Sequence, residues 1–522
     1  MNWKRPLALS TAALTLGTAL AACGNPTAAA PDPTPTPAAE VQSLSTTGST
    51  VKAPKYVFLF IGDGMSYPQI QSTSDFLGAL NDADYRQAQP SLDDNGGAIL
   101  DGPEYLNFMN FEAAGSAVTY DSNSFAPDSA STATSISTGY KTYSGSINVD
   151  ETGTISYETI AEQLHAQKGY SVGVITSVNL NHATPAAFYA HQASRNDYYD
   201  IGLELIDSGF EYFAGGGLLK PTGAEGDQAD LYALAEKEGY HVVKTQAEAE
   251  QVTGGPVVII DEHLADSDAM AYEIDRTDDM WALADYVEKG IEVLSQDKDG
   301  FFMMCEGGKI DWACHANDAA STIHDTQALA DAVQVAIDFA KEHADETLIL
   351  VTSDHETGGL TIGFAGTDYD TYLDLLESQK ISYAKFDSDY VSRYKEDKTS
   401  FEDVLKDVEA LFGLKPQGEE GDKLVLTDYE LEQLRAAYEK SVNGTAASQY
   451  EQEEYVLYGT YEPLSVTLTH IINNKSGISF TSYSHTGLPV AVLAHGVNAG
   501  QFNGYYDNTQ IYHKLAGMLG IA

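Results

Sequence analysis

Several acidic and histidine residues follow strongly apolar segments of this chain, and their side chains are of the types that bind divalent metals. Asp63 comes after the apolar run 56–61, inside a Gly-Asp-Gly turn. Asp354 and His355 come after the apolar run 347–352. Glycines on both sides of Asp63 would let the backbone and a metal approach closely. Each segment alone is weak evidence, because many Asp-Gly pairs are only turns.

A second group of candidate ligands lies between residues 305 and 315. Glu306 follows another apolar run, and Asp311 and His315 are four positions apart. This spacing places Asp311 and His315 on one face of a helix, where they can close on one ion. His485 stands shortly before the last apolar run. A lone histidine is more often structural than a ligand, but the set together favours a metal site. Mixed histidine and carboxylate ligands suit zinc, and all-oxygen ligands suit magnesium.

Ser129 is the candidate nucleophile. It lies in the run Asp128-Ser-Ala-Ser-Thr-Ala-Thr134, which we expect to form a helix with Pro127 in its first turn and Gly139 at its end. A serine at a helix N-terminus lies where backbone N–H groups attract phosphate or sulfate. Its hydroxyl still needs a base or a metal to lose its proton. Taken alone, the run fits a closely packed core helix equally well.

The apolar runs alternate with helical patterns, which is typical of an α/β fold with a mostly parallel sheet sandwiched between helices. In such sheets, ligands bind beyond the carboxyl ends of the strands, where the candidate ligands occur. The expected strands are residues 56–61, 171–176, 257–260, 301–304, 347–352 and 490–494, and the expected helices are 158–168, 280–296 and 324–343.

The pattern changes between about residues 366 and 458. Tyrosines and charged residues dominate there, no strand run appears, and Ser400 and Thr427 have the sequence context of helix N-caps. We expect a helical insertion before the last core strands. A lid over the site, a contact in a homodimer and a surface addition without function all fit this composition, and the last is the simplest interpretation.

Charge limits the partners of the chain. The 522 residues include 28 Lys and Arg against 77 Asp and Glu, a formal net charge of −49, and 43% of the residues are hydrophobic. A chain of this length can bury a large core. Its negative charge argues against nucleic acid and anionic lipid headgroups as specific partners.

The first 51 residues have the composition of a signal peptide followed by a tether. Residues 1–22 have the positive and apolar regions of a signal peptide, and the run ending at Cys23 resembles the lipobox of bacterial lipoproteins, which implies a lipid anchor on Cys23. The alternative is an ordinary signal peptide with an incidental cysteine. Residues 23–51 have the composition of a flexible tether, so the folded body is expected at 52–522. These features predict a periplasmic or cell-surface protein attached to a membrane.

Six motifs together make the chain similar to alkaline phosphatases, in the order in which that family has them. Each motif alone is modest, but the ordered set spans most of the body. The motifs are Gly62-Asp-Gly-Met65, Asp128 to Thr134, His182-Ala-Thr-Pro185 leading to His191 through Arg195, Glu306 to His315, Thr352-Ser-Asp-His-Glu356 and His485-Thr-Gly487.

The resemblance implies a phosphomonoesterase that acts on small substrates through a phosphoserine on Ser129, with Arg195 gripping the phosphate oxygens. It implies two Zn²⁺ and one Mg²⁺ as cofactors. One zinc would be held by Asp311, His315 and His485, the other zinc by Asp63, Asp354 and His355, and the magnesium by Asp63, Thr184 and Glu306.

Three residues are expected beside the ligands without binding metal themselves, namely Asp128, His182 and Trp312. His182 and Trp312 stand where the best-studied enterobacterial pattern has Asp and Lys, which affects how firmly the third metal and the phosphate are held. The alternatives are a phosphodiesterase or sulfatase of the same superfamily, and a vestigial metal-binding surface lipoprotein. A sulfatase would need a modified Cys or Ser in a Cys/Ser-x-Pro-x-Arg motif, which the run after Ser129 lacks.

Overall fold

The computed structural model describes residues 52–82, 100–444 and 451–521. The predicted signal peptide, the tether and Cys23 lie outside these residues, so the anchor stays a prediction. Within the described ranges, no helix combines the length and apolar character needed to cross a membrane. The described cysteines, Cys305 and Cys314, are both free and buried.

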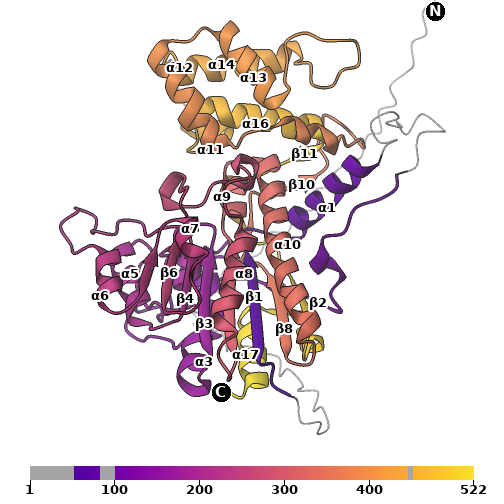
Figure 1. Cartoon of the computed structure of the whole chain (residues 1–522). Coiled ribbons are helices and arrows are strands. Elements are labelled where there is room, and N and C mark those ends of the chain that lie inside the picture. Colours follow the sequence, from indigo (N-terminus) through magenta and orange to yellow (C-terminus); the bar gives the residue numbers. More distant parts are fainter. Residues whose placement is uncertain (1–51, 83–99, 445–450, 522) are drawn as a thin grey trace, which may run out of the picture. The chain divides into compact units, whose positions relative to one another are not determined.

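A ten-stranded sheet runs through the body, in the order β14-β2-β13-β8-β1-β7-β3-β4-β6-β5 (Figure 1). All neighbouring strands are parallel except that β13 runs antiparallel to both β2 and β8. The prediction of a mostly parallel sheet is confirmed. The strands are β1 (Tyr56–Gly62), β2 (Ala113–Val118), β3 (Ser171–Thr176), β4 (Tyr212–Gly215), β5 (His241–Val243), β6 (Val257–Ile260), β7 (Phe301–Gly307), β8 (Thr347–Thr352), β13 (Val490–Gly496) and β14 (Gly504–Asp507).

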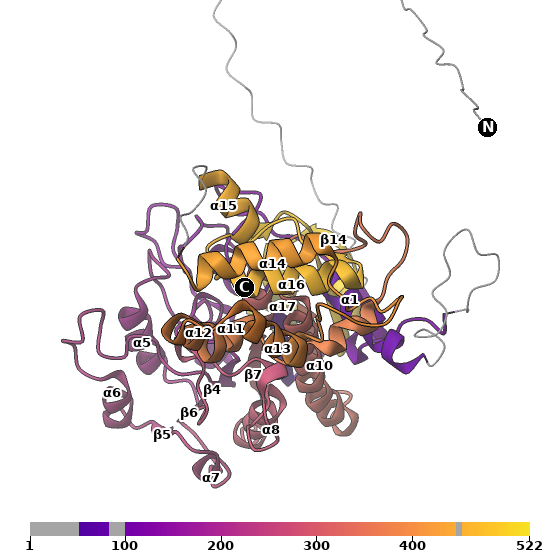
Figure 2. The ribbon, with the colours of Figure 1, turned by 90° about the horizontal axis from the view of Figure 1, so that it is seen from above.

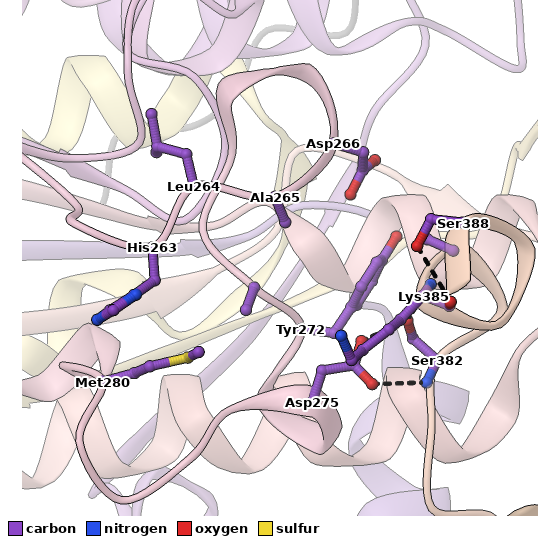
Figure 3. Close-up of a pocket in the computed structure, with 12 residues that line it drawn as sticks. His263, Leu264, Ala265, Asp266, Tyr272, Asp275, Met280, Ser382, Lys385 and Ser388 are labelled. Carbon is purple, nitrogen blue, oxygen red and sulfur yellow. Dashed lines mark hydrogen bonds between the residues drawn. The ribbon is translucent and has the colours of Figure 1, made fainter. Parts of the chain in front are cut away.

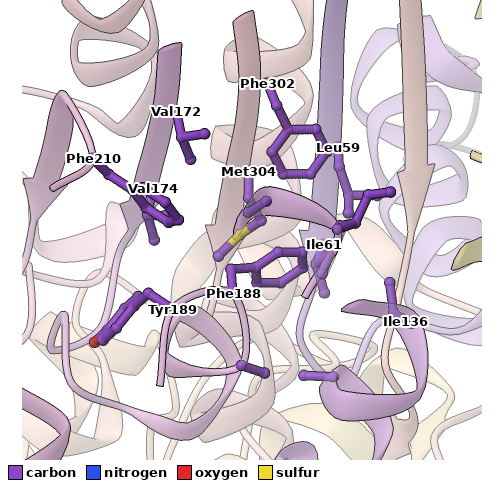
Figure 4. Packing of buried hydrophobic residues seen from close by; sticks show 14 of the residues in the cluster. Leu59, Ile61, Ile136, Val172, Val174, Phe188, Tyr189, Phe210, Phe302 and Met304 are labelled. Atoms are coloured by element: carbon purple, nitrogen blue, oxygen red, sulfur yellow. The ribbon is translucent and has the colours of Figure 1, made fainter. Parts of the chain in front are cut away.

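The central strands are continuous apolar runs because both faces of the sheet are covered. Along β1, Leu59 and Ile61 point into one hydrophobic cluster, and Phe58 and Phe60 point into another on the opposite face. Figure 4 shows the first cluster, in which strand side chains meet Phe188, which lies in a turn, and Ile136, which lies in a helix. This two-sided burial holds the carboxyl ends of the strands in register, and the candidate site lies at those ends.

Helices form a layer on each face of the sheet. Residues of α2, α3, α4, α5, α6 and α17 join the first cluster, and residues of α1, α7, α8, α9 and α10 join the second. The bounds are α1 (Tyr67–Asn81), α2 (Ser129–Thr138), α3 (Ile160–Lys168), α4 (Ala183–Ala186), α5 (Tyr198–Asp207), α6 (Leu231–Lys237), α7 (Gln246–Ala249), α8 (Leu283–Leu294), α9 (Lys309–His315), α10 (Ala319–Glu342) and α17 (Thr509–Leu519). The helix expected at 324–343 begins five residues earlier, where Asp318 caps it.

The insertion is helical, as predicted, and has its own hydrophobic cluster, which also contains residues of α1 and α10. Ser400 and Thr427 cap α13 and α14 through their side chains, as expected. The helical region continues beyond residue 458, because α16 runs to Ser476 and packs along α14 (Figure 2). The helices are α11 (Tyr383–Phe386), α12 (Ser392–Asp397), α13 (Phe401–Phe412), α14 (Asp428–Ser441), α15 (Glu451–Tyr458) and α16 (Pro463–Ser476).

Candidate metal and phosphate site

Three neighbouring strands deliver carboxylates to one edge of the sheet. Asp63 directly follows β1, Glu306 is the next-to-last residue of β7, and Asp354 lies two residues beyond β8. Glu306 is therefore inside its strand rather than after it. Gly64 has φ +72°, and a Cβ there would lie 3.0 Å from Asp311 Oδ1, so this turn requires glycine.

Two further elements complete the set of candidate ligands. Helix α9 carries Asp311 and His315 on one face, as the four-residue spacing predicts. The short strands β9 (Glu356–Thr357) and β12 (His485–Thr486) pair with each other, with His485 opposite Thr357. This pairing stacks the imidazole of His485 on that of His355, with ring centroids 3.7 Å apart.

Asp311, His315 and His485 form one candidate metal site. The Nδ1 atoms of His315 and His485 each lie 2.6 Å from a backbone carbonyl, those of Tyr483 and Pro127. Each Nδ1–H therefore donates to a carbonyl, and each Nε2 of a neutral ring carries a lone pair. The two Nε2 atoms lie 3.0 Å apart. Two lone pairs at this distance repel each other unless a cation or proton lies near both, so these residues fit a metal.

Asp63, Asp354 and His355 form a second candidate site beside the nucleophile. The Nε2 of His355 lies 3.1 Å from Ser129 Oγ, 3.3 Å from Asp354 Oδ2 and 3.5 Å from Asp63 Oδ1. In a Ser-His-Asp triad, serine and carboxylate would contact opposite nitrogens of the imidazole. Here all three oxygens approach the same nitrogen. The arrangement fits a cation that Ser129 Oγ can also reach.

Asp63 and Glu306 also face a third candidate site. Asp63 Oδ1, Asp354 Oδ2 and Glu306 Oε1 are buried and have no hydrogen-bond partner among the described residues. Burial, with repulsion from neighbouring carboxylates that include Asp311, raises the pKa of Glu306 to about 8 and that of Asp354 to about 7. The Thr184 hydroxyl donates a hydrogen bond of 3.4 Å to Asp63 Oδ2, so this hydroxyl also lies beside the third candidate site. Buried oxygens of this kind fit cations.

His182 lies beside the third site, and its ring accepts a hydrogen bond from Arg195. Arg195 Nη2 is 3.1 Å from His182 Nε2, and guanidinium only donates. Burial lowers the pKa of His182 to about 3, so the ring is neutral and carries its hydrogen on Nδ1. This buried Nδ1 has no partner among the described residues. His182 can reach Asp63 and Glu306, but in this tautomer it offers a donor rather than a ligand atom.

Asp128 links the nucleophile helix to Arg195. Its carboxylate caps α2 by accepting from the backbone N–H of Ser131, and it accepts from Arg195 Nη1 at 2.8 Å. The helix begins at Ser129 and ends at Gly139, whose φ is +79°. Pro127 precedes the cap, so the expectation that it lies in the first helical turn is wrong. Asp128 takes the cap because its side chain satisfies a free N–H, which proline cannot do.

One cavity of about 490 Å³ is lined by Ser129 and by four residues that were not predicted from the sequence. Asp266 and Ser267, in the segment that follows β6, line this cavity. Tyr383 and Tyr461 line it from the insertion, which is therefore part of the site rather than a distant addition. No periodicity or motif marks these four residues. The expected residues Arg195, His182, Trp312, Asp311, His315 and His485 line the same cavity.

The family of the chain follows from comparison with known proteins. Residues 54–521 match the sequence model of the alkaline phosphatase family. This chain belongs to the alkaline phosphatase family. Alkaline phosphatase 3 of Bacillus subtilis is 30% identical over 465 residues, which cover 88% of this chain and 87% of that protein. The Escherichia coli alkaline phosphatase is 28% identical over 350 residues, covering 58% of this chain and 70% of that protein.

Solved alkaline phosphatases share the fold. The cold-active enzyme of the psychrophile Shewanella sp. aligns with a TM-score of 0.70 at 28% identity, covering 89% of this chain and 99% of that one. The Thermus thermophilus alkaline phosphatase aligns with a TM-score of 0.71 at 24% identity, covering 91% and 93%. The predictions of fold, family and enzyme class are confirmed, and the phosphodiesterase, sulfatase and vestigial alternatives are not favoured.

Proposed function

We propose that this alkaline phosphatase transfers the phosphoryl group of a small monoester to Ser129 and then to water. The observation that carries this proposal is the position of the Ser129 hydroxyl. It lies at the N-terminus of α2 and 3.1 Å from His355 Nε2, the same atom that Asp63 and Asp354 approach. A nucleophile placed at a cation site is suited to attack on phosphorus.

We propose two Zn²⁺ and one Mg²⁺ as cofactors. Zinc suits the two sites that contain histidine, and magnesium suits the site of Asp63, Thr184 and Glu306, whose ligand atoms are all oxygens. When bound, such metals lower the pKa of the hydroxyl groups that they contact and neutralise phosphate charge.

The protein's own residues have separable tasks. Ser129 Oγ gives its hydroxyl proton to solvent and forms a bond to phosphorus while the bond from phosphorus to the alcohol oxygen breaks, and the alcohol oxygen takes a proton from solvent. Water then attacks the phosphoserine, which releases phosphate and regenerates Ser129. Arg195 offers its remaining N–H groups to the phosphate oxygens, while Asp128 holds its Nη1 at 2.8 Å. The N-terminus of α2 favours the negative charge.

Hydrolysis of p-nitrophenyl phosphate with and without a chelator tests the proposal. We expect activity that the chelator abolishes and that added Zn²⁺ and Mg²⁺ restore. Bis(p-nitrophenyl) phosphate and p-nitrophenyl sulfate serve as probes for diesterase and sulfatase activity and should be poor substrates. A purified, metal-loaded protein that cleaves none of the three would contradict the proposal and favour a vestigial site.

We also propose export and attachment to a membrane through lipid on Cys23, on the basis of the sequence alone. Two or more acyl chains hold a protein firmly, whereas one chain binds only marginally. Replacing Cys23 with Ala should move the enzyme from the membrane fraction to the soluble fraction, and an unchanged distribution would contradict the anchor. Assembly into a homodimer stays a prediction, which the mass in light scattering tests.

A further inference from the structure

We propose that Tyr461, Tyr383 and Trp312 form a subsite for the leaving group, and that it accepts a flat aromatic ring joined to the alcohol. The proposal rests on the proposed function, because it concerns the alcohol part of the same substrate. A ring of this kind belongs either to an aryl alcohol or to the base of a nucleoside. Stacking on aromatic side chains recognises both sources.

The position of Tyr461 relative to the nucleophile gives the first argument. In an in-line displacement, the leaving oxygen departs on the side opposite the attacking oxygen. Ser129, His315, His485 and Tyr461 all line one cavity, so a substrate with its phosphorus at Ser129 has its alcohol part in the same cavity. The carbonyl of Tyr483 holds His315, and the ring of Tyr461 lies 6.3 Å from the ring of Tyr483. Tyr461 therefore lines the space that is open to the alcohol part of the substrate.

The aromatic residues form one cluster. Tyr383 is a buried member of the cluster, with Tyr272, and Trp312 and Tyr461 pack against it. The rings of Tyr383 and Tyr461 meet edge to face, with centroids 5.6 Å apart. Trp312, Tyr383 and Tyr461 also line the cavity that contains Ser129. Aromatic walls beside a few polar groups are typical of sites that bind an organic ring.

Buried hydrogen bonds fix Tyr383 in place, which preorganises the wall. The backbone N–H of Tyr383 donates to Asp318 at 3.0 Å, and its hydroxyl accepts from Tyr272 at 3.2 Å. The neighbouring Ser382 donates to Asp275 through its backbone and its hydroxyl, at 2.9 and 2.5 Å. Figure 3 shows Asp275 and Ser382 in the wall of a neighbouring cavity of about 470 Å³. Residues of the insertion and of the loop around Tyr272 line this cavity. A rigid ring loses little entropy when a ligand stacks on it.

The charge of the cavity restricts the leaving group further. Asp266 lines both this cavity and the adjoining one. The fully buried Lys309 holds the Asp266 carboxylate at 3.0 Å, and the ammonium also lies 4.8 Å from the Trp312 ring. The Asp266 side chain is still 43% exposed, so its negative charge faces solvent at the wall. The pair of Asp266 and Lys309 carries no net charge, so this part of the wall suits an uncharged ring.

The test compares the substrate profiles of wild type and Tyr461→Leu. Benzyl phosphate and cyclohexylmethyl phosphate have the same type of leaving oxygen and similar size, but only benzyl is flat. Adenosine monophosphate tests a nucleobase, and glycerol phosphate has no ring. We expect kcat/KM of the variant for benzyl phosphate, for adenosine monophosphate or for both to fall about tenfold relative to glycerol phosphate. A loss confined to one of them identifies the ring as aryl or as nucleobase.

Two variants serve as controls. Tyr461→Phe keeps the ring and should retain the wild-type profile. Tyr429→Leu removes an exposed tyrosine of α14, at 69% exposure, that does not line the cavity, and it should change no substrate. Equal changes for all four substrates, or an equal loss for cyclohexylmethyl and benzyl phosphate, would overturn the aromatic subsite. If wild type cleaves none of the four, including glycerol phosphate, the proposed function itself fails.

Discussion

The hydroxyl of Ser129 and the Nε2 of His355 lie 3.1 Å apart, at a point where the carboxylates of Asp63 and Asp354 also converge. Burial lowers the pKa of His355 well below its ordinary value, and the neighbouring His485 adds to the effect. The ring is therefore neutral, and among the described residues its Nδ1 contacts the hydroxyl of Thr357, at 3.3 Å, and no carboxylate that would make it a strong base. The proposed function therefore has Ser129 activated by a cation at this point, and the following predictions test the parts of that arrangement.

Replacing Ser129 with Ala should lower turnover by several powers of ten, because covalent catalysis would be lost. The fold and the metal content should not change. Steady-state and burst kinetics with p-nitrophenyl phosphate measure the effect. Ser135→Ala is a matched control, because Ser135 is buried in the same helix and donates only to the carbonyl of Ser131, at 3.0 Å. Turnover by Ser129→Ala equal to that of the control would remove Ser129 from the mechanism.

Removing the metals should abolish activity and lower the melting temperature by several degrees, because buried carboxylates would then face one another without a counter-ion. Elemental analysis, turnover and calorimetry before and after chelation check this. Glu306→Gln is a sharper probe, since it should lower magnesium content and leave zinc content unchanged. A protein that is active without zinc, or whose melting temperature does not respond to chelation, would contradict the proposed cofactors.

Replacing Trp312 with Lys should make inorganic phosphate a stronger inhibitor, by about tenfold, because a cation would be added near the bound dianion. Adding His182→Asp should strengthen magnesium binding, because a carboxylate would replace a neutral ring beside Asp63 and Glu306. If phosphate release limits turnover, kcat should fall in both variants. Inhibition constants for phosphate and magnesium titrations measure these effects.

The control for this charge effect is Trp312→Met, which removes the ring without adding a cation. The Lys309 ammonium lies 4.8 Å from the Trp312 ring, so Trp312→Lys adds a second positive charge beside an existing one, and Trp312→Met does not. If the Lys and Met variants bind phosphate equally, a cation at position 312 does not affect phosphate binding, and the proposed tuning is wrong.

His191 should make stability depend on pH. Burial alone would lower its pKa, but the carboxylates of Glu162 and Glu204 outweigh burial and raise the pKa to about 10. The stabilisation is therefore complete below the unfolded pKa of roughly 6.5 and is lost as pH rises through the folded value. His191→Gln should lower the free energy of unfolding by about 2 kcal/mol near pH 6 and by little near pH 10.5.

Denaturant unfolding at several pH values measures this difference. His241→Gln is the control, because His241 is an exposed histidine on the edge strand β5. A loss for His191→Gln that is the same at all pH values would mean that the ring contributes packing and not charge. Because His191 begins the segment that carries Arg195, the KM for substrate should rise together with the lost stability.

The sequence alone predicted the candidate ligands because their position depends on local order. Asp63, Glu306 and Asp354 each come at or just after an apolar run, and the ends of parallel strands meet at one edge of the sheet. The spacing of Asp311 and His315 likewise determines that they share a helix face. Patterns within one element survive folding, so they could be interpreted without the structure.

Some strands and some residues of the cavity wall could not be predicted from the sequence. The strand β2 (Ala113–Val118) has small residues and alternating burial, and β14 (Gly504–Asp507) is short and mostly exposed. Neither has the apolar run that marks a strand buried on both faces. Tyr383 and Tyr461 belong to an insertion whose composition predicted helices but gave no indication that two of its side chains reach the cavity.

The sequence by itself determined the family, the parallel sheet and the types of the candidate ligands, because these follow from local order and residue chemistry. The tertiary structure decided how the candidate ligands point. His315 and His485 turn their Nε2 atoms toward each other because the carbonyls of Tyr483 and Pro127 take their Nδ1–H groups. A backbone carbonyl is the same at every residue, so no side-chain pattern can mark it, and only the folded chain brings these carbonyls to the two rings.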